Sequence, residues 1–451
     1  MSKTEEELIN NNEIIIPPKD ENIQNKTTKS KISLIQQLKI NKAGLNIFLF
    51  NALIFITYNI NINHLYFGYF TKKIGLIQCF LLLIFIGVFS ILFQINLIKK
   101  LEINNEDTLS AMIQEHFGLL CSQLFEILCF LWVIFNFLIT FLTYFHFIII
   151  SYFGNEDQFK FSNNWFSCII IMIIFIIVFL IINSLENSSV IDINIILNFL
   201  LDFLSILLMG KKLYLGIRDN KIKGKIWENN FDENQFIKAI CIFSNSFHSL
   251  LVLFYVNKKL KLSLYPILEH KKILWINHIM IFLFYSFYIF QGYFDVFEDN
   301  NYEYLLSIII NNKNTKIEDY TLIICNILSQ ILNINFYLYT IKNSILRNSV
   351  QIQFKNKISV FMFTLLILII FTVFGGFCYF NQVSTYNLSL INNSSFGLLV
   401  NFLFPFLFIL KYHLRYSSYF LLSVIFLVSS VCLIPLYEVI QDFLLYYKII
   451  G

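Results

Sequence analysis

The chain has 451 residues, of which 57% are hydrophobic and 14% charged, and its mean hydropathy is +0.67. Soluble domains carry about 25% charged residues, so this composition excludes an ordinary soluble protein. The net charge of +4 is spread over short loops and does not indicate a nucleic-acid-binding patch. The eight cysteines have neither metal-ligand spacing nor a disulfide framework, so no metal site is predicted.

The first segment of the chain differs in composition from the rest. Residues 1–40 are polar, with an acidic run at Glu5–Glu7 and a pair of prolines at Pro17–Pro18. Such a segment cannot bury enough apolar surface to fold. We therefore expect residues 1–40 to form a disordered cytoplasmic tail without a signal peptide, and residues 41–451 to form one polytopic transmembrane domain.

Apolar runs recur along nearly the whole of that domain. A helix needs about 20 mostly apolar residues to cross the hydrocarbon core of a bilayer, and backbone groups in lipid must be satisfied within the helix. The sequence therefore predicts an all-α integral membrane protein with about eleven spans. We place them at residues 46–70, 75–97, 121–151, 165–183, 190–209, 236–256, 273–294, 320–341, 358–380, 393–410 and 418–436.

Lysine and arginine set the expected orientation. With the N-terminus inside, the inner segments carry 20 of the 33 Lys and Arg residues, which follows the positive-inside rule. Loop 210–235 is an exception, because it places Lys211, Lys212 and further basic residues outside. The acidic loop 295–319 suits the outside. Asn387–Ser389, in the expected outer loop after span nine, forms a possible glycosylation sequon.

Polar clusters interrupt the first and the sixth spans. The first contains Tyr58–Leu65 and the sixth contains Phe243–Ser249, and each cluster pairs asparagine with histidine. Many transporters consist of two inverted repeats whose first helices are broken near the middle of the membrane. Asparagine tolerates the backbone conformation of such a break and caps half-helices. We therefore predict two inverted five-helix repeats plus one span, with helices 1 and 6 broken.

Ionisable residues inside spans form a second group of candidates. Asp202 lies in the middle of span five, where a carboxylate costs about 2.5–3.5 kcal/mol to insert, and we interpret it as an ion-coupling candidate. His248 lies in the sixth break and has an ordinary pKa that would let it titrate near neutral pH. Glu126, nearer a helix end, is predicted to reach toward the interface.

The combined order and spacing are similar to the amino acid/auxin permease family, over most of residues 40–436. Asp107–Met112 followed by Glu115–Gly118 resembles the family's short amphipathic helix before span three. Gly292–Tyr293 followed by Phe297–Asp299 resembles its Gly-Tyr-x-x-Phe-Gly-Asp motif, with one extra residue. Asn333–Asn335 resembles a Ser-Tyr-Pro stretch in span eight. In the first span, Asn61 and Asn63 stand at the family's two glycines, and Gly68 stands at its proline.

The resemblance implies a leucine-transporter-like fold and secondary active transport of amino acids by alternating access. The coupling ion would be H⁺ or Na⁺, with protons favoured. Partners would be an amino acid and the lipid bilayer, without nucleic acid, and the membrane would be the plasma membrane or that of a vacuole or lysosome. The substrate is expected to bind at the two breaks, and the coupling ion beside them. The substrate-binding candidates are Asn61, Asn63, His64, Tyr66, Ser244, Asn245, Ser246 and Phe247, and the ion-coupling candidates are His248, Asp202, Asn333 and Asn335.

Other functions stay open at this stage. Transport of a different small organic solute fits the same helices. A membrane-embedded acyltransferase would also place histidine and asparagine inside spans, but no soluble-enzyme or nucleotide-binding motif is found. A seven-span receptor would leave several spans unexplained. The preferred interpretation is a transporter that is not an enzyme.

Overall fold

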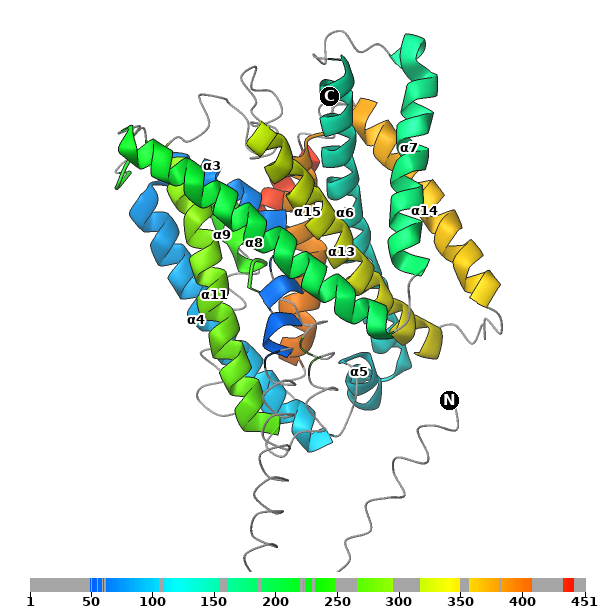
Figure 1. Cartoon of the computed structure of the whole chain (residues 1–451). Helices are drawn as coiled ribbons and strands as arrows, with labels where there is room; N and C mark the ends of the chain where they lie inside the picture. The colour runs from blue at the N-terminus through cyan, green and yellow to red at the C-terminus, as the bar shows by residue number, and fades with distance from the viewer. Residues whose placement is uncertain are drawn as a thin grey trace, which may run out of the picture. The chain divides into compact units, whose positions relative to one another are not determined.

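The protein is described by a computed structural model (Figure 1). It describes residues 49–441 except for 50, 55, 59, 61, 105–108, 154–160, 185–187, 220–221, 223, 229–231, 248–252, 254–255, 257–265, 295–316, 349–356, 381–382 and 408–432. The predicted polar tail at residues 1–40 therefore lies outside the described residues, as does most of the predicted eleventh span.

Helices make up the regular structure of the described residues, and none of these residues lies in a β-strand. The longer ones coincide with the apolar runs, because a helix satisfies its own backbone groups in an apolar medium. In chain order they are η2 (Ile62–Tyr66), α3 (Phe67–Ile74), α4 (Leu76–Asn104), α5 (Leu109–Phe117), α6 (Leu119–Phe153), α7 (Phe161–Ser184), α8 (Ser188–Arg218), α9 (Glu233–Ser244), α11 (Pro266–Phe294), α13 (Ile317–Asn348), α14 (Lys357–Phe380) and α15 (Thr385–Asn392). The last continues into two π-helical segments, η4 (Asn393–Gly397) and η5 (Leu399–Leu403).

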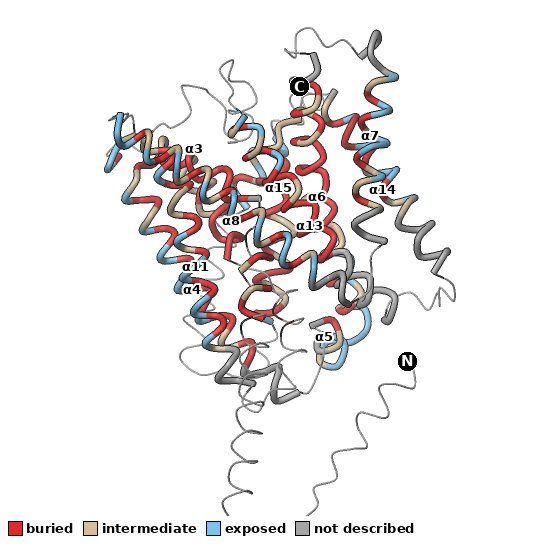
Figure 2. The backbone as a smooth tube through the Cα atoms, viewed as in Figure 1, coloured by how far each residue is buried: buried red, intermediate tan, exposed pale blue. Residues whose placement is uncertain are grey.

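Several of these helices are built to cross a membrane. Within the described ranges, five are long and apolar enough by length and composition. Large apolar side chains are exposed along α4, α7, α8 and α14, whereas much of α6 and α15 is buried (Figure 2). Apolar side chains that face outward all along a helix are stable in lipid and not in water. The prediction of an all-α integral membrane protein is confirmed.

The helices pack as neighbours in a pattern that places α6 and α15 centrally. α4 lies beside α11, α7 lies beside α14, and α6 contacts both α13 and α15 (Figure 1). α3 crosses α11 at a point where Gly68 meets Gly292, and a Cβ atom on Gly292 would lie only 2.0 Å from the Gly68 oxygen. Glycine is therefore needed for this close approach of two backbones.

The first and the sixth spans are both interrupted, as predicted. The described residues between 49 and Tyr58 are helical, whereas Ile60 is not. The chain then continues as the 3₁₀-helix η2 and as α3. In the sixth span, Asp232 caps the start of α9 by accepting a hydrogen bond from Asn234 N at 2.9 Å. α9 ends at Ser244, and the next three residues form a turn and a bend.

A short stretch after α8 joins the start of α4 to the end of α11. Gly75 ends α3 with a positive φ of 95°, which favours glycine. Leu76 N and Ile77 N, at the start of α4, donate to Lys225 O and Ile226 O, each at 3.0 Å. Gly224 N donates to Tyr293 O, in the last turn of α11, at 2.9 Å. These bonds satisfy backbone groups that helix ends otherwise leave open.

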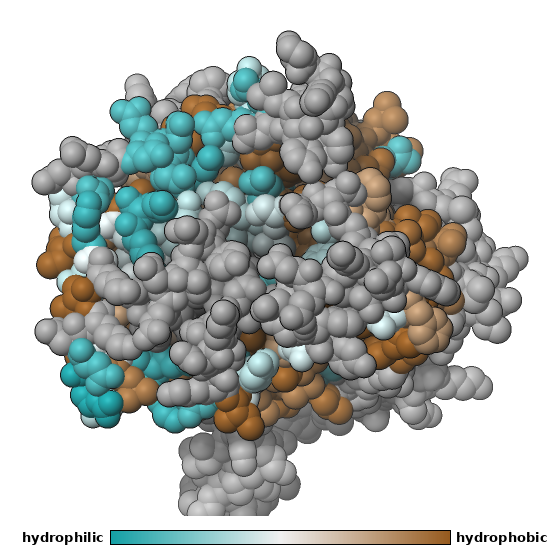
Figure 3. Space-filling model, turned by 90° about the horizontal axis from the view of Figure 1, so that it is seen from above, coloured by the Kyte–Doolittle hydropathy of each residue, from teal (hydrophilic) through white to brown (hydrophobic). Residues whose placement is uncertain are grey.

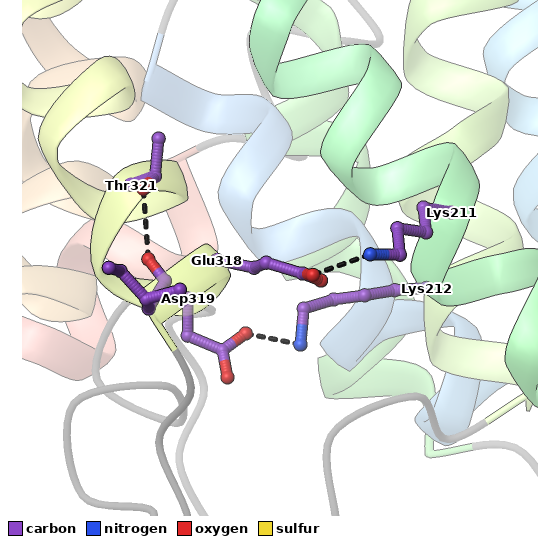
Figure 4. Close-up of polar contacts among 6 residues, drawn as sticks. Lys211, Lys212, Glu318, Asp319 and Thr321 are labelled. Carbon is purple, nitrogen blue, oxygen red and sulfur yellow. Dashed lines mark hydrogen bonds and ion pairs between the residues drawn. The ribbon is translucent and has the colours of Figure 1, made fainter.

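Three of the basic residues predicted in loop 210–235, Lys211, Lys212 and Arg218, belong to a helix and not to a loop. α8 continues past the predicted end of span five, and Lys211 pairs with Glu318 at 2.5 Å while Lys212 pairs with Asp319 (Figure 4). Both acids lie in the first turn of α13, which runs antiparallel to α8. The basic residues thus meet acids from the far side of the acidic loop 295–319, so their charge is locally compensated. Seen from above, hydrophilic side chains gather over part of the surface, beside apolar ones (Figure 3).

Two expectations about polar residues are wrong. Glu126 does not reach toward the interface: it is 3% exposed and accepts a hydrogen bond from Ser110 Oγ of α5 at 2.5 Å. The sequon residues Asn387–Ser389 lie in α15 and not in a loop, and Ser389 is buried. In both cases a partner distant in sequence determines the environment. The predicted short helix at Asp107–Gly118 is confirmed as α5, which ends at Gly118 with a φ of 87°.

Candidate functional site

The break in the first span leaves carbonyl groups that α13 satisfies. Asn333 Nδ2 donates to Ile60 O at 3.0 Å, and the Tyr337 hydroxyl donates to Tyr58 O. Unpaired carbonyls inside an apolar protein would cost about 1–3 kcal/mol each. Asn333, predicted as an ion-coupling residue, therefore lies directly at the break.

The break in the sixth span is held in the same way by α4 and α11. Tyr285 donates its hydroxyl to Ser246 O at 2.6 Å. Gln94 Nε2 and Ser90 Oγ lie 3.0 and 3.3 Å from Phe247 O. Two helices of the bundle thus supply the donors that the missing helical turn would have supplied.

His278 supports this second set of contacts. Its Nδ1 atom lies 2.9 Å from Leu274 O, and its Nε2 atom lies 3.1 Å from Ser90 Oγ. Because a carbonyl oxygen can only accept, Nδ1 carries a hydrogen. Ser90 has a single hydroxyl hydrogen, so it donates either to Phe247 O or, when the ring is neutral, to Nε2. The Phe247 ring stacks on the imidazole, with 5.5 Å between ring centroids.

A buried network of amides connects the two breaks with α15. Asn63 Nδ2 donates to Asn393 Oδ1 at 3.2 Å, and Asn393 Nδ2 donates back to Asn63 Oδ1 at 2.8 Å. Asn245 Nδ2 donates to Asn393 O at 3.0 Å. Asn401 Nδ2 donates to Asn245 Oδ1 at 3.1 Å, and Ser389 Oγ donates to Asn63 Oδ1 at 3.2 Å. We call these five residues the amide network; each is at most 3% exposed.

Aromatic rings enclose the network on the side of η2 and α3. Phe67 stacks on Phe243 with 4.1 Å between centroids, and Phe247 meets Tyr285 edge to face at 5.6 Å. Tyr66 donates to Thr385 O at 3.1 Å. Such rings exclude water and strengthen the polar contacts beside them.

A second polar group lies between α8 and α13. Asn198 and Asp202 face Ser329 and Asn333, with both pairs four residues apart, so that each pair occupies one helix face. Ser329 Oγ donates to Asp202 Oδ1 at 2.7 Å, and Asn198 Nδ2 donates to Asn333 Oδ1 at 2.7 Å. We call these four residues the α8–α13 seam.

The Asp202 carboxylate has spare capacity. It is 5% exposed, and its Oδ2 atom has no hydrogen-bond partner among the described residues. Among the described residues its hydrogen-bond partner is Ser329, and Tyr288 and Cys325 lie close enough to interact with its charge. One buried carboxylate oxygen is therefore available for a proton or a cation.

His64, in η2 just after the first break, makes a further contact with α13. Its Nε2 atom lies 3.3 Å from Asn326 Oδ1, one helical turn from Ser329. Its ring meets Tyr288 edge to face, with centroids 4.5 Å apart. At 1% exposed, His64 lies between the amide network and the α8–α13 seam.

Comparisons with known proteins find similarity to solved structures. No family model matches the chain, and no curated protein matches it. Among solved structures, the chain is similar to a Na⁺-coupled sialic acid symporter in its substrate-bound outward-open state. That likeness has 12% sequence identity, covers 88% of this chain and 96% of the other, and has a TM-score of 0.42.

The predicted site residues fall into three groups. Asn63, His64, Tyr66 and Ser244–Phe247 come together around the breaks, and Asp202 and Asn333 come together in the seam. Asn335 does not join them: both its side-chain amide atoms are buried without a partner among the described residues. His248 and Asn61 lie outside the described residues.

Sequence reasoning missed the contribution of α15. Asn392 to Ser395 form a polar run inside an apolar span, which is the same signal that marked the other two breaks. The sequence prediction places this run at the start of span ten. Sequence reasoning also missed Ser90, Gln94 and Tyr285, because a single polar residue in an apolar helix does not indicate which carbonyl group it contacts.

Proposed function

We propose that this chain is a secondary active transporter that moves amino acids by alternating access. The observation that carries the proposal is the amide network, in which two broken helices meet at buried polar groups inside an apolar bundle. Broken helices at the middle of the membrane expose backbone groups to a substrate. Polar side chains inside a membrane span cost free energy to insert, and where they are retained they mark functional sites.

The substrate would bind where the first helix resumes. The η2–α3 segment presents the positive end of its dipole and its first amide groups near Asn63, which suits an α-carboxylate. The α-ammonium would be accepted by oxygens near Ser244–Ser246. Phe247 and Tyr66, both at most 1% exposed, would line the side-chain pocket.

Asp202 is our proposed coupling residue. A carboxylate that is buried without a cationic partner is stable only when it binds a proton or a cation. In the α8–α13 seam it lies one turn along α8 from Asn198, whose partner Asn333 donates to Ile60 O at the first break. We favour a proton, because a single carboxylate with one hydroxyl donor supplies few ligands for a metal ion.

The test uses purified protein in liposomes. We would measure uptake of labelled neutral amino acids with an inward proton gradient, an inward sodium gradient or neither. Saturable uptake that follows the proton gradient is expected. In Asn63→Leu it should fall at least about tenfold, equivalent to about 1.4 kcal/mol.

Asp202→Asn separates coupling from binding. It keeps the volume and the Ser329 contact but cannot bind a proton, so uptake should no longer respond to the gradient while exchange of amino acid persists. Asp219→Asn, at the exposed end of α8, is the control and should behave as the wild type. If the folded wild type moves no amino acid under any gradient, the proposal is wrong and other organic solutes must be tested.

A further inference from the structure

We infer that α15 forms a third side of the substrate site, that Asn393 is a substrate-binding residue there, and that the substrate carries no net charge. The inference rests on the proposed function and names the substrate class of that same site. Neither broken helix supplies these contacts alone, because the amide network closes only through residues of α15 and its continuation.

The pairing of Asn63 with Asn393 is reciprocal. Each amide donates to the oxygen of the other, so each presents one donor and one acceptor along the same edge. Asn393 Nδ2 also lies 3.2 Å from Ser389 Oγ, one turn earlier on the same helix. A pair of facing amides offers two donors and two acceptors to a group that separates them.

An amino-acid head group matches that pattern. When one of the two amides turns over by about 180°, both Nδ2 groups lie at one end and donate to its carboxylate, while both Oδ1 atoms lie at the other end and accept from its ammonium. Inserted between Asn63 and Asn393, a zwitterion would exchange two amide–amide hydrogen bonds for charge-assisted ones, which are roughly twice as strong. The two amides satisfy each other when the substrate is absent, so the empty site contains no unpaired polar group at this pair.

The charge of the network fixes the class of substrate. Its five members are asparagine and serine, and none of them ionises. The five network residues offer a substrate with a net charge no counter-charge, and burying an uncompensated charge costs several kcal/mol. A side chain that is neutral is therefore favoured over that of an acidic or a basic amino acid.

The helix geometry on this side is also unusual. η4 begins at Asn393 and η5 ends at Leu403, and both are π-helical. π-Helical turns occur mostly at functional sites, because the wider turn redirects side chains. Gly397 lies in η4 at the point of contact with the sixth break, and a Cβ atom there would meet Asn245 Oδ1 at 2.7 Å. The chain therefore brings α15 against both breaks at once.

The experiment measures binding without requiring transport. Purified wild type is titrated with serine, glutamine, glutamate and lysine, and thermal unfolding is followed. Serine and glutamine should stabilise the protein and the two charged amino acids should not. Asn393→Ala should weaken serine binding about tenfold, as expected for losing a hydrogen bond to a charged group. The same variant should raise the KM of uptake more than it lowers the maximal rate.

Asn392→Ala is the matched control. Asn392 is the neighbouring residue, is 1% exposed and pairs with Asn136 outside the amide network at 3.2 Å. Its affinity for serine should stay within about twofold of wild type. If both variants lose binding equally, Asn393 has only a structural role.

Asn393→Asp tests the charge argument and does not depend on the alanine variant folding. It is isosteric and adds one negative charge, so lysine should now bind in preference to serine. Hydrogen exchange of residues 385–403 in the wild type should slow when serine is added. Unchanged exchange, or wild-type binding of glutamate or lysine as tight as that of serine, would overturn the inference. A wild type that binds none of the four would instead disprove the proposed function.

Discussion

Gly68 and Gly292 cross backbone to backbone, so that a Cβ atom on Gly292 would lie 2.0 Å from the Gly68 carbonyl oxygen. The relationship fixes how closely α3 approaches α11. Gly292→Ala should destabilise the protein by about 1–3 kcal/mol, because the added methyl group forces two backbones apart. The measurement is thermal unfolding of the purified protein in detergent.

Gly210→Ala is the control for that substitution. In α8 the new Cβ atom would lie 3.6 Å from Phe287 Cε1, an ordinary contact. Alanine is favoured over glycine in a helix by about 1 kcal/mol, so this variant should be neutral or slightly more stable. If both variants unfold at the wild-type temperature, the close crossing does not exist.

The two ion pairs between α8 and α13 should differ in their contributions. The side chains of Lys212 and Asp319 are 13% and 8% exposed, whereas those of Lys211 and Glu318 are 57% and 32% exposed. Removing one partner of a buried pair leaves an uncompensated charge and costs about 3–5 kcal/mol. Removing an exposed partner costs at most about 1 kcal/mol.

Lys212→Met should therefore lower the unfolding temperature clearly and Lys211→Met only slightly. Exchanging both charges, Lys212→Asp with Asp319→Lys, should restore part of the loss. Equal effects of the two methionine variants would show that the pairs are equally solvated.

Tyr285 anchors the sixth break through one hydroxyl group. Tyr285→Phe removes the donor to Ser246 O, which is buried, and should cost about 1–3 kcal/mol of stability. Tyr214→Phe removes a hydroxyl group from an exposed side chain of α8 and should leave the stability unchanged. Unfolding in detergent compares the two variants, and an unchanged stability of Tyr285→Phe would contradict a stabilising role of the 2.6 Å hydrogen bond to Ser246 O.

Ser110 and Glu126 hold α5 against α6. Glu126→Gln replaces a charge-assisted hydrogen bond by a weaker neutral one, so backbone amides of α5 should exchange faster with deuterium. The control is Glu115→Gln, since Glu115 is largely exposed and contacts His116 on the same helix. Exchange in α5 that is unchanged by Glu126→Gln would show that the helix is held by other contacts.

Much of the architecture could be predicted because the membrane imposes simple rules. The length of the apolar runs predicts the spans. Clusters of asparagine predict both breaks, because polar side chains inside an apolar span cost free energy unless they are hydrogen-bonded. The position of α5 followed from its similarity to a known pattern. These signals depend on residues that are close in sequence.

Partners that are distant in sequence could not be predicted. Asn63 and Asn393 are 330 residues apart, and nothing local indicates that their amides meet. The position of Glu126 near a helix end predicts a place at the interface, but its burial depends on Ser110, which belongs to a different helix. Likewise, nothing local indicates that Lys211 and Lys212 pair with acids at the start of α13.

The backbone bonds of residues 224–226 restrict which parts can move against each other. They join the first turn of α4 to the last turn of α11, and Gly68 packs on Gly292 beside them. A rotation that separated α4 from α11 at this end would break these main-chain bonds. The hydrogen bonds and ion pairs described between α8 and α13 join side chains, so a displacement there would break none of these main-chain bonds. A shear movement is therefore better accommodated between α8 and α13 than between α4 and α11.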